Sequence, residues 1–371
     1  MPVSEVSPRA AFVRERQAVE RVWFGEGAGE RAARVALLPL ELAYGAVVAV
    51  RNALYDRGVA TVHETAVPAV SVGNLTVGGT GKTPVAAWIA AELQSRGLRP
   101  ALVLRGYGDD EPLVHTRLNP RVPVVVAADR VTGVARARAD HHATVAVLDD
   151  AFQHRRARRE ADVVLLSADR WTGRRPHLLP AGPWREPLRA LRRASLVVVT
   201  RKAATPARAE EALRAALAAA PGVPSAVVYL APGDLQRVTP GGDATSLPLD
   251  ALAGARVLAV SAVGDAAAFH AQLVAAGAVL DPPPAAYPDH HPFSSADAER
   301  LARDGERAQL VVCTLKDAVK LAPLWPRAGA PLWYVSQRVV LERGRESMDR
   351  LLARVAAVVA PDGRAPLATP A

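Results

Sequence analysis

The segment from residue 73 to residue 84, which reads GNLTVGGTGKTP, has the residue types needed to bind a nucleoside triphosphate. It follows an apolar strand predicted over 67–72 and precedes a helix predicted over 83–96, so its N–H groups can turn inward around phosphate oxygens. Lys82 would reach the β- and γ-phosphates, and the Thr83 hydroxyl would hold Mg²⁺. The residues predicted to contact ATP are Thr76, Val77, Gly78, Gly79, Thr80, Gly81, Lys82 and Thr83.

This loop departs from the strict G-x-x-x-x-G-K-[ST] pattern at one position, because Thr76 stands where that pattern has glycine. The alternative interpretation is a glycine-rich turn without a nucleotide. The agreement of strand, glycines, lysine and helix disfavours that alternative. Lysine is also scarce in this arginine-rich chain, so a lysine at the expected position of the loop is harder to explain by chance.

An acidic strand end supplies the second half of the predicted site. The run 145–150 reads VAVLDD and ends in Asp149 and Asp150. A carboxylate at the C-terminal end of a parallel strand faces the ligand side of the sheet, and oxygen ligands suit Mg²⁺. Such a run alone is weak evidence, but its place after a phosphate loop predicts that both aspartates hold the metal or its waters.

The elements that position these residues alternate between short apolar strands and helices. Strands are predicted over 67–72, 100–104, 123–126, 144–148, 162–166 and 195–200, and a second set over 225–230, 256–261, 309–314 and 331–335. Strands rich in Val, Ile and Leu with helices between them indicate a mostly parallel sheet. We therefore expect an α/β protein with a P-loop NTPase-like domain and a second, smaller α/β lobe across a cleft. The expected parts are an N-terminal segment 1–57, a kinase domain 58–222, a C-terminal lobe 223–360 and a tail 361–371, with a hinge at 220–224.

The most apolar segment of the chain is 35–50, which contains Pro39 and Glu41 and is flanked by arginines at 31, 34 and 51. A bilayer-spanning helix needs about 20 apolar residues, so this segment is short for a span. An apolar helix with arginine flanks can lie in the interface of an anionic leaflet, and a buried amphipathic helix is the alternative. No cleavable signal peptide is predicted in the first twenty residues.

Composition restricts the possible partners. The formal net charge is +9, which indicates a solvated basic surface, or a surface that attracts anionic lipid or nucleic acid. Few aromatic residues are interleaved with the basic clusters, so we favour lipid and expect no nucleic-acid partner. Cys313 is the single cysteine, so no intramolecular disulfide and no cysteine-based zinc site are expected; it lies in an apolar run and is predicted to be a core thiol.

Several further strings are more specific than general nucleotide binding. They are RGYG at 105–108, DDAFQH at 149–154, LPAGPWREP at 179–187, YPDHHPFS at 287–294 and TLKDAVKL at 314–321. With the phosphate loop, and in this order, they resemble the tetraacyldisaccharide 4′-kinases, the lipid A 4′-kinases. The resemblance runs from about residue 20 to residue 340. It implies ATP-dependent phosphorylation of the 4′-hydroxyl of a tetraacylated glucosamine disaccharide 1-phosphate, which forms lipid IVA. It also implies a location at the cytoplasmic face of the inner membrane, with 35–50 at the position of a bilayer-contacting helix.

The resemblance also implies a pair of residues, an aspartate and a histidine, that activates the sugar hydroxyl. The matching positions are Asp110 and His290, and a carboxylate beside an imidazole can orient the ring or accept the proton. Asp109 is an alternative to Asp110, because the stretch after RGY is shorter here than in the family pattern. A turn-capping carboxylate, a structural histidine and a metal site at 289–291 are the other interpretations.

Other residues of these strings are candidates for contacts with phosphate, metal or sugar. Glu186 could bind metal-bound water or a sugar hydroxyl, and Arg185 a phosphate, with a surface ion pair as the alternative. Arg105 is a candidate for the substrate phosphate, and His154, with Gln153, for the nucleotide or sugar. Lys316 and Asp317 could contact nucleotide or close the cleft. The chain departs from the family pattern at Ala151, where glycine is usual, and at Leu315, where glutamate is usual.

Two functions of other classes compete with the lipid kinase. The first is a soluble partition-type P-loop switch ATPase; Val77, where those proteins carry an extra lysine, and the histidine-rich loop at 289–291 count against it. The second is a basic nucleic-acid-binding NTPase, which rests on charge alone.

Overall fold

The computed structural model describes residues 18–106, 110–173, 176–238, 245–264, 266–289 and 291–359. Of the predicted site residues, Asp109 and His290 lie outside these described residues, as do Tyr107, Gly108 and the tail 361–371.

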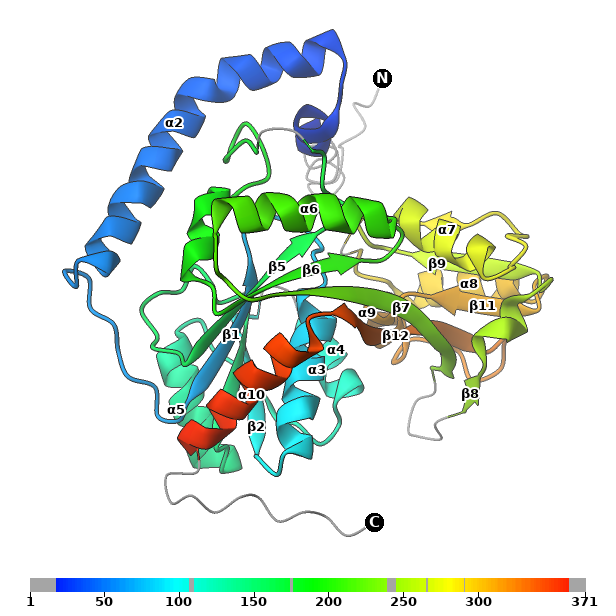
Figure 1. Ribbon diagram of the computed structural model, residues 1–371. Helices are drawn as coiled ribbons and strands as arrows, with labels where there is room; N and C mark the ends of the chain where they lie inside the picture. The colour runs from blue at the N-terminus through cyan, green and yellow to red at the C-terminus, as the bar shows by residue number, and fades with distance from the viewer. Residues whose placement is uncertain are drawn as a thin grey trace, which may run out of the picture.

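One continuous twelve-stranded sheet runs through the chain (Figure 1). Its order is β10-β9-β11-β12-β7-β6-β5-β1-β4-β2-β3, with β8 paired to β7. The strands of the first half are β1 (Ala69–Asn74), β2 (Pro100–Leu104), β3 (Val124–Val126), β4 (Val145–Asp149), β5 (Ala161–Ser167) and β6 (Leu196–Arg201). Those of the second half are β7 (Ser225–Arg237), β8 (Ser246–Leu247), β9 (Val257–Ser261), β10 (Ala285–Ala286), β11 (Leu310–Cys313) and β12 (Leu332–Arg343).

The N-terminal lobe comprises β1–β6 and the helices on both faces of this part of the sheet. All its strand pairs are parallel, and its apolar strands alternate side chains between two cores. Helices α3 (Lys82–Ser95) and α10 (Arg345–Val359) cover one face, and α5 (Arg130–His141) and α6 (Pro206–Ala219) cover the other. Helix α4 (Asp110–Leu118) lies between β2 and β3 in the chain. The three-layer arrangement confirms the predicted α/β fold class.

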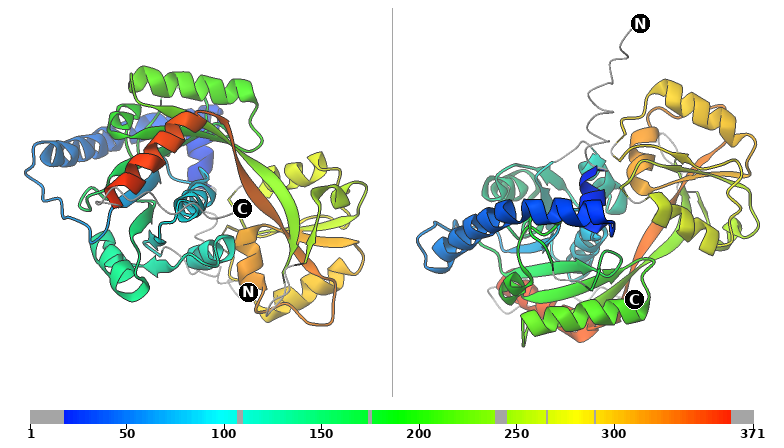
Figure 2. Two further views of the ribbon diagram at one scale, coloured as in Figure 1. Left: turned by 60° about the horizontal axis from the view of Figure 1, so that its bottom comes forward. Right: turned by 90° about the horizontal axis from the view of Figure 1, so that it is seen from above.

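The C-terminal lobe comprises β9, β10 and β11 with helices α7 (Ala266–Ala275), α8 (Ser295–Gly305) and α9 (Leu315–Leu321). The two lobes share one sheet because β7 and β12 form a long antiparallel pair that crosses between them (Figure 2, left). The strand predicted over 225–230 therefore continues to Arg237. Helix α10 returns the chain to the N-terminal lobe, and the boundary at 222–223 stays a prediction.

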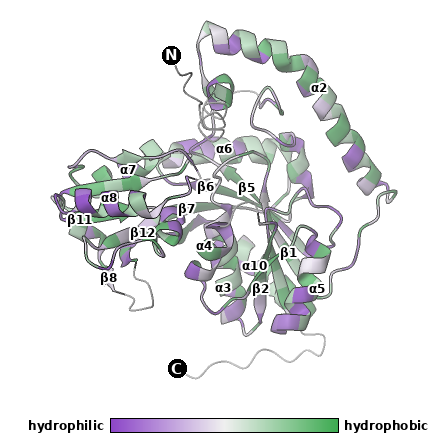
Figure 3. Ribbon diagram, turned by 180° about the vertical axis from the view of Figure 1, so that it is seen from behind, coloured by the Kyte–Doolittle hydropathy of each residue, from purple (hydrophilic) through white to green (hydrophobic). Residues whose placement is uncertain are grey.

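Helix α2 (Ala28–Asp56) is longer than the apolar segment 35–50, because the helix continues through the arginine-containing flanks. None of its residues is buried, and it is long and apolar enough to cross a membrane by length and composition alone. It lies along the outside of the N-terminal lobe, and Figure 3 shows that much of its surface is hydrophobic. Its exposed apolar side chains are Val35, Leu40, Leu42, Val47, Val50 and Leu54.

Candidate active site

The phosphate loop joins the end of β1 to the start of α3, as the sequence predicts. Gly81 precedes the helix with φ +81°, a left-handed conformation that favours glycine, and an added Cβ there would lie 2.4 Å from Leu230 Cδ1. Two side chains hold the loop from within. Asn74 Nδ2 donates to Thr80 Oγ1 at 2.8 Å, and Thr200 Oγ1 donates to the Thr80 carbonyl at 2.8 Å. The loop is therefore fixed before any nucleotide arrives.

The segment 177–187, which contains the LPAGPWREP string, runs beside the phosphate loop. The Val77 N–H donates to the Pro183 carbonyl at 2.8 Å, and the Arg185 N–H donates to the Leu75 carbonyl at 2.7 Å. Thr76 and Trp184 form an isolated antiparallel bridge between these bonds. Backbone pairing thus explains why a proline- and glycine-rich string so far along the chain belongs to the nucleotide site.

Asp150 meets two cations at the end of β4. Lys82 Nζ lies 3.6 Å from its Oδ1, and Arg185 donates to both carboxylate oxygens, at 3.0 and 3.1 Å. Burial alone would raise the pKa of Asp150, but the charges and hydrogen bonds of Lys82 and Arg185 outweigh it, so the pKa lies below its usual value. The residue has φ +49°, whereas Ala151 is not among the positive-φ residues. Alanine in place of the family's glycine therefore carries no strain here.

Asp149 is held from a different side. Its Oδ2 lies 2.8 Å from Nε2 of His115, and Arg130 donates to its backbone carbonyl at 3.2 Å. All three side chains are almost completely buried. Within the described part of the chain, Asp149 Oδ1 has no hydrogen-bond partner. A buried oxygen in that state costs free energy unless a ligand or its water occupies it.

Asp110 and Glu111 begin α4 next to these acids. Asp110 is buried, 5% exposed, at the first position of the helix. Burial raises the pKa of Glu111, and the charge of Asp149 raises it further, against the opposing effect of Lys316 from α9. Helix α4 thus brings a second pair of carboxylates to the strand end, next to a cation of the C-terminal lobe. No sequence pattern singles out Glu111, His115 or Arg130 as site residues.

The residues on either side of His290, at 287–289 and from His291 on, belong to the described part of the chain. The His291 ring stacks on Tyr287 with centroids 4.7 Å apart, and Lys320 Nζ donates to the His291 carbonyl at 3.2 Å. Ser294 and Asp297 form a capping box that begins α8. These contacts fix the chain on the C-terminal side of the predicted catalytic histidine.

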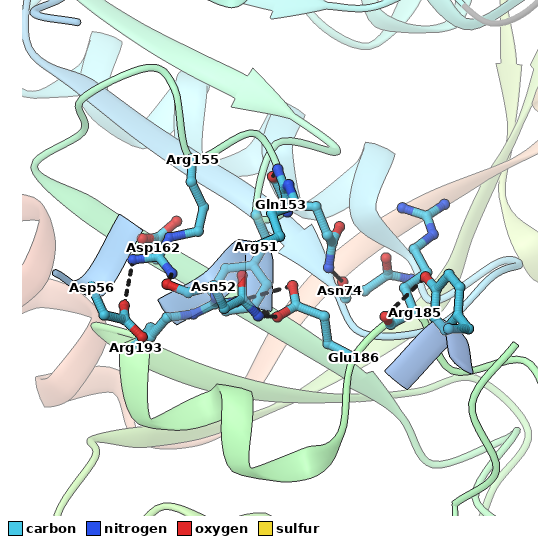
Figure 4. Close-up of polar contacts among 12 residues, drawn as sticks. Arg51, Asn52, Asp56, Asn74, Gln153, Arg155, Asp162, Arg185, Glu186 and Arg193 are labelled. Atoms are coloured by element: carbon cyan, nitrogen blue, oxygen red, sulfur yellow. Dashed lines mark hydrogen bonds and ion pairs between the residues drawn. The ribbon is translucent and has the colours of Figure 1, made fainter. Parts of the chain in front are cut away.

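The remaining candidates fall at different places. Glu186 is 1% exposed and both its oxygens accept from Arg193, at 2.8 and 3.0 Å, while Asn52 of α2 donates to Oε2 at 2.7 Å (Figure 4). These contacts favour a structural role for Glu186, and its metal role stays a prediction.

His154 Nε2 lies 3.9 Å from Asp129 Oδ1. Burial lowers the pKa of His154, and the charge of Arg130 lowers it further. Arg105 is exposed just beyond the end of β2.

Helix α2 contacts the same segment 177–187 through its polar side chains. Glu41 accepts from the Leu178 N–H at 3.0 Å and lies 2.9 Å from His177 Nδ1, and the Tyr44 hydroxyl donates to the Arg185 carbonyl at 3.1 Å. Near the helix end, Arg155 Nη2 pairs with Asp56 at 2.7 Å (Figure 4). The one carboxylate in the apolar segment 35–50 therefore faces the protein, which leaves the opposite side of the helix apolar.

A cavity of about 600 Å³ lies between the start of α2 and the phosphate loop. Arg34 donates to the Val22 and Gly25 carbonyls, and Arg31 donates to the Glu26 carbonyl. These bonds are made to backbone carbonyl groups, and Glu26 itself also lines the cavity. The lining includes four aromatic rings, four arginines and two residues of the phosphate loop: Trp23, Phe24, Trp171, Trp184, Arg31, Arg34, Arg170, Arg208, Thr76 and Val77.

The oxygen ligands around the phosphate loop suit Mg²⁺ better than a metal ion whose ligands must all come from the protein. Thr83 supplies a hydroxyl, Asp149 and Asp150 supply carboxylates, and Asp149 Oδ1 is the orphaned acceptor among them. No cluster of three His, Cys, Asp or Glu side chains suited to a metal occurs within the described residues. Mg²⁺ commonly uses one or two carboxylates together with the phosphates of the substrate, and the residues present fit that mode.

The parallel sheet, the phosphate loop before α3 and the acidic end of β4 place the chain in the class of P-loop nucleotide-binding proteins. The sequence profile of the tetraacyldisaccharide-1-P 4′-kinase family matches residues 33–110 and 108–356. A tetraacyldisaccharide 4′-kinase of Anaeromyxobacter sp. (strain Fw109-5) is 41% identical, over 91% of this chain and 97% of that protein. One of Halorhodospira halophila is 38% identical, over 87% of this chain and 92% of that protein. The chain therefore belongs to the tetraacyldisaccharide 4′-kinase family.

A solved structure agrees with this assignment. The "apo" form of LpxK from Aquifex aeolicus, in complex with ATP, superposes with a TM-score of 0.69 at 28% identity, and the match covers 87% of this chain and 99% of that one. The family, the fold class and the kinase activity that the sequence predicts are confirmed. The partition-type ATPase is not the family that matches.

Proposed function

We propose that this protein transfers the γ-phosphate of ATP, with Mg²⁺, to the 4′-hydroxyl of a tetraacyldisaccharide 1-phosphate that it takes from the cytoplasmic face of the inner membrane. One observation carries the proposal: the large cavity shares Thr76 and Val77 with the phosphate loop and Arg31 and Arg34 with the exposed helix α2. Donor site, acceptor cavity and lipid-facing helix are thus adjacent in one lobe.

The chemistry of the cavity supports an amphiphilic, anionic acceptor. Arginine guanidinium groups bind phosphate through charge and paired hydrogen bonds. Aromatic rings such as Trp23 and Trp171 pack against sugar faces or acyl chains, and both rings line this cavity. A soluble sugar would need the polar groups but not this amount of apolar lining, so the cavity favours the lipid-linked substrate.

On the donor side, Lys82 and the backbone of residues 76–83 hold the triphosphate. Mg²⁺, when bound, would neutralise charge on the phosphates, and Thr83, Asp149 and Asp150 would hold it. The charges of Lys82 and then of Arg185 lower the pKa of Asp150 against the effect of burial, and Arg185 lies beside the loop, where the phosphates of ATP would also attract it. Phosphoryl transfer needs mainly positioning and charge stabilisation, which is what these residues offer.

For the acceptor hydroxyl, we propose that Asp110 and His290 remove the proton. Asp110 is buried at the start of α4, next to Glu111, whose pKa is raised by burial and then by the charge of Asp149. A base in this position would lie near the metal site, where a sugar hydroxyl must approach the γ-phosphate.

The membrane part of the proposal rests on α2. Its polar side chains Glu41, Tyr44 and Asn52 contact the protein, whereas six of its large apolar side chains, from Val35 to Leu54, are exposed. A helix bound to protein on one side and apolar on the other is suited to the interface of a bilayer, and the flanking arginines suit anionic headgroups. We therefore propose that α2 lies in the membrane surface with the rest of its lobe attached beneath it.

The test is a direct assay in detergent or mixed vesicles with ATP, Mg²⁺ and the tetraacyldisaccharide 1-phosphate, read by the mass of the bisphosphorylated product. Lys82→Ala is expected to lower kcat by at least about 10²-fold while the melting temperature stays within a few degrees, because one charge-assisted contact to the transferred phosphate is lost. Arg350→Ala, an exposed cation on α10, is the matched control and is expected to keep full activity.

Two results would refute the proposal. The first is an active Lys82→Ala variant, since the lysine of a working phosphate loop cannot be dispensable. The second is equal turnover of the acylated disaccharide and of the same disaccharide without acyl chains, since the aromatic cavity and α2 would then have no part in acceptor binding.

A further inference from the structure

The buried contact between His115 and Asp149 gives His115 a place in the site that the proposal above does not use. His115 is on the inner side of α4, its side chain is 0% exposed, and its Nε2 lies 2.8 Å from Asp149 Oδ2. Histidine is seldom placed in a fully apolar position without a hydrogen bond, because burying an unpaired polar ring is costly. Here one ring nitrogen has a partner, and that partner is the carboxylate at the end of strand β4.

The two oxygens of Asp149 are therefore not equivalent. Oδ2 is occupied by the imidazole, whereas Oδ1 is buried with no hydrogen-bond partner in the described part of the chain. The carboxylate side chain is 7% exposed, so bulk water does not serve Oδ1. A buried acceptor left unpaired costs about 1–3 kcal/mol, which an incoming ligand or its bound water can recover.

The tautomer of His115 follows from this contact. The carboxylate is an acceptor, so Nε2 carries the hydrogen and donates it, and the ring acts as a rigid donor fixed by the packing of α4. The backbone carbonyl of Asp149 is held separately by Arg130 at 3.2 Å. Arg130 at the start of α5 thus holds the main chain of Asp149, and His115 of α4 holds its side chain.

We propose that His115 is a positioning residue for the phosphoryl-transfer site: its Nε2–H holds Oδ2 of Asp149 and so reserves Oδ1 for Mg²⁺ or a Mg²⁺-bound water. The inference rests on the proposed metal role of Asp149. Outer partners of this kind orient the ligand that contacts the metal, and their loss commonly lowers metal affinity or activity about 10–100-fold.

Two substitutions of similar polarity separate this role from a merely structural one. His115→Gln can place an amide N–H where Nε2 now is, whereas the amide of His115→Asn ends nearer the Nδ1 position and does not reach Oδ2. Binding of Mn²⁺ to the full chain is measured by electron paramagnetic resonance with the non-hydrolysable analogue β,γ-methylene-ATP. The Asn variant is expected to weaken Mn²⁺ binding about 10–100-fold. The Gln variant is expected to stay within about 3-fold of the parent, because a single retained donor keeps most of the orientation.

The controls use the same assay. His270→Asn removes a histidine of the C-terminal lobe whose Nε2 lies 3.1 Å from Ser261 Oγ, and it is expected to leave Mn²⁺ binding unchanged. In an Asp149→Asn background, adding His115→Asn is expected to change nothing further, because His115 acts only through Asp149. Binding of the analogue without metal is expected to be the same in all variants.

The outcomes distinguish the inference from the function beneath it. If Asp149→Asn weakens Mn²⁺ binding but His115→Asn and His115→Gln behave alike, the positioning role is overturned and the metal site remains. If Asp149→Asn itself leaves Mn²⁺ binding unchanged, the metal role fails and the inference fails with it.

A second measurement uses the unmodified chain, in case His115→Asn does not fold. In protein labelled with ¹⁵N-histidine, adding Mg²⁺ to the analogue complex must shift the His115 Nε2–H resonance, because the same carboxylate serves both groups. An unchanged resonance overturns the proposal.

Discussion

The exposed apolar side of α2 makes a quantitative prediction about membrane binding. Leu42 is 74% exposed and Val50 is 61% exposed, and their eight-residue spacing places them on the same outward side of the helix. Full burial of a Leu or Val side chain is worth about 1.5–3 kcal/mol, so the exposed fractions of these two residues together offer about 3 kcal/mol to a bilayer. The double variant Leu42→Ser/Val50→Ser is therefore expected to bind vesicles about 100-fold more weakly.

The assay is co-sedimentation with vesicles that contain anionic lipid, over a range of lipid concentrations that gives the partition coefficient. The matched control is Val274→Ser/Val279→Ser, which removes two exposed valines of the C-terminal lobe, 54% and 50% exposed. The control is expected to bind like the parent protein. Because neither substituted α2 side chain is buried, the melting temperature is expected to change by only a few degrees. Equal vesicle binding by the α2 variant and the parent would refute the reasoning, as would an equal loss in both variants.

Two further predictions concern the loop between β10 and α8 and the first turn of α8. His290→Ala is expected to lower kcat by about 10²–10⁴-fold with little change in the KM for lipid, the usual effect of losing a general acid–base group, and a change confined to KM would contradict that role. Hydrogen bonds from the hydroxyl and N–H of Ser294, then from Arg300 and His291, lower the pKa of Asp297 from 3.8 to about 2. A depressed folded-state pKa gives stability that is present above pH 3.8 and is lost as the pH falls toward 2. Asp297→Asn is thus expected to lower the free energy of unfolding at pH 7 by about 1 kcal/mol, after allowance for solvent screening, and by almost nothing near pH 2. Denaturant midpoints for both proteins between pH 7 and 2 test this, and curves that stay parallel throughout would disprove it.

Much of the fold could be predicted from the sequence because strands buried on both faces leave a strong local signal. The strand predicted over 100–104 matches β2, and the helix predicted over 83–96 matches α3 to within one residue at each end. The phosphate loop is similarly local, since its glycines, lysine and flanking elements are consecutive. Lengths were harder to predict: the strand starting at Ser225 continues to Arg237 only because β12 pairs with its second half.

The contacts that complete the site depend on residues far apart in the chain. Nothing near Trp184 indicates that it pairs with Thr76, and the backbone bonds between these segments have no side-chain signature. His115 could have been noticed, because it stands five residues after Asp110 on a short amphipathic helix, but its partner Asp149 is 34 residues away. The place of Glu186 in the LPAGPWREP string predicts a contact with metal-bound water or a sugar hydroxyl. The structure adds a contact that the string does not indicate, because Arg193, seven residues further along, donates to both carboxylate oxygens of Glu186.

The segment 177–187 gives helix α2 and the nucleotide site a common support. Its backbone forms hydrogen bonds with the phosphate loop, and Glu41 and Tyr44 of α2 form hydrogen bonds with the same segment. The segment also contains Arg185, which contacts Asp150. If α2 lies in the membrane surface as proposed, a displacement of the helix by the bilayer would be absorbed within the residues 177–187, which also shape the triphosphate pocket. Lipid composition and detergent can then alter nucleotide kinetics in this enzyme without any molecule entering the nucleotide site, and substitutions on the outer helix can produce the kinetic defects of an active-site mutation.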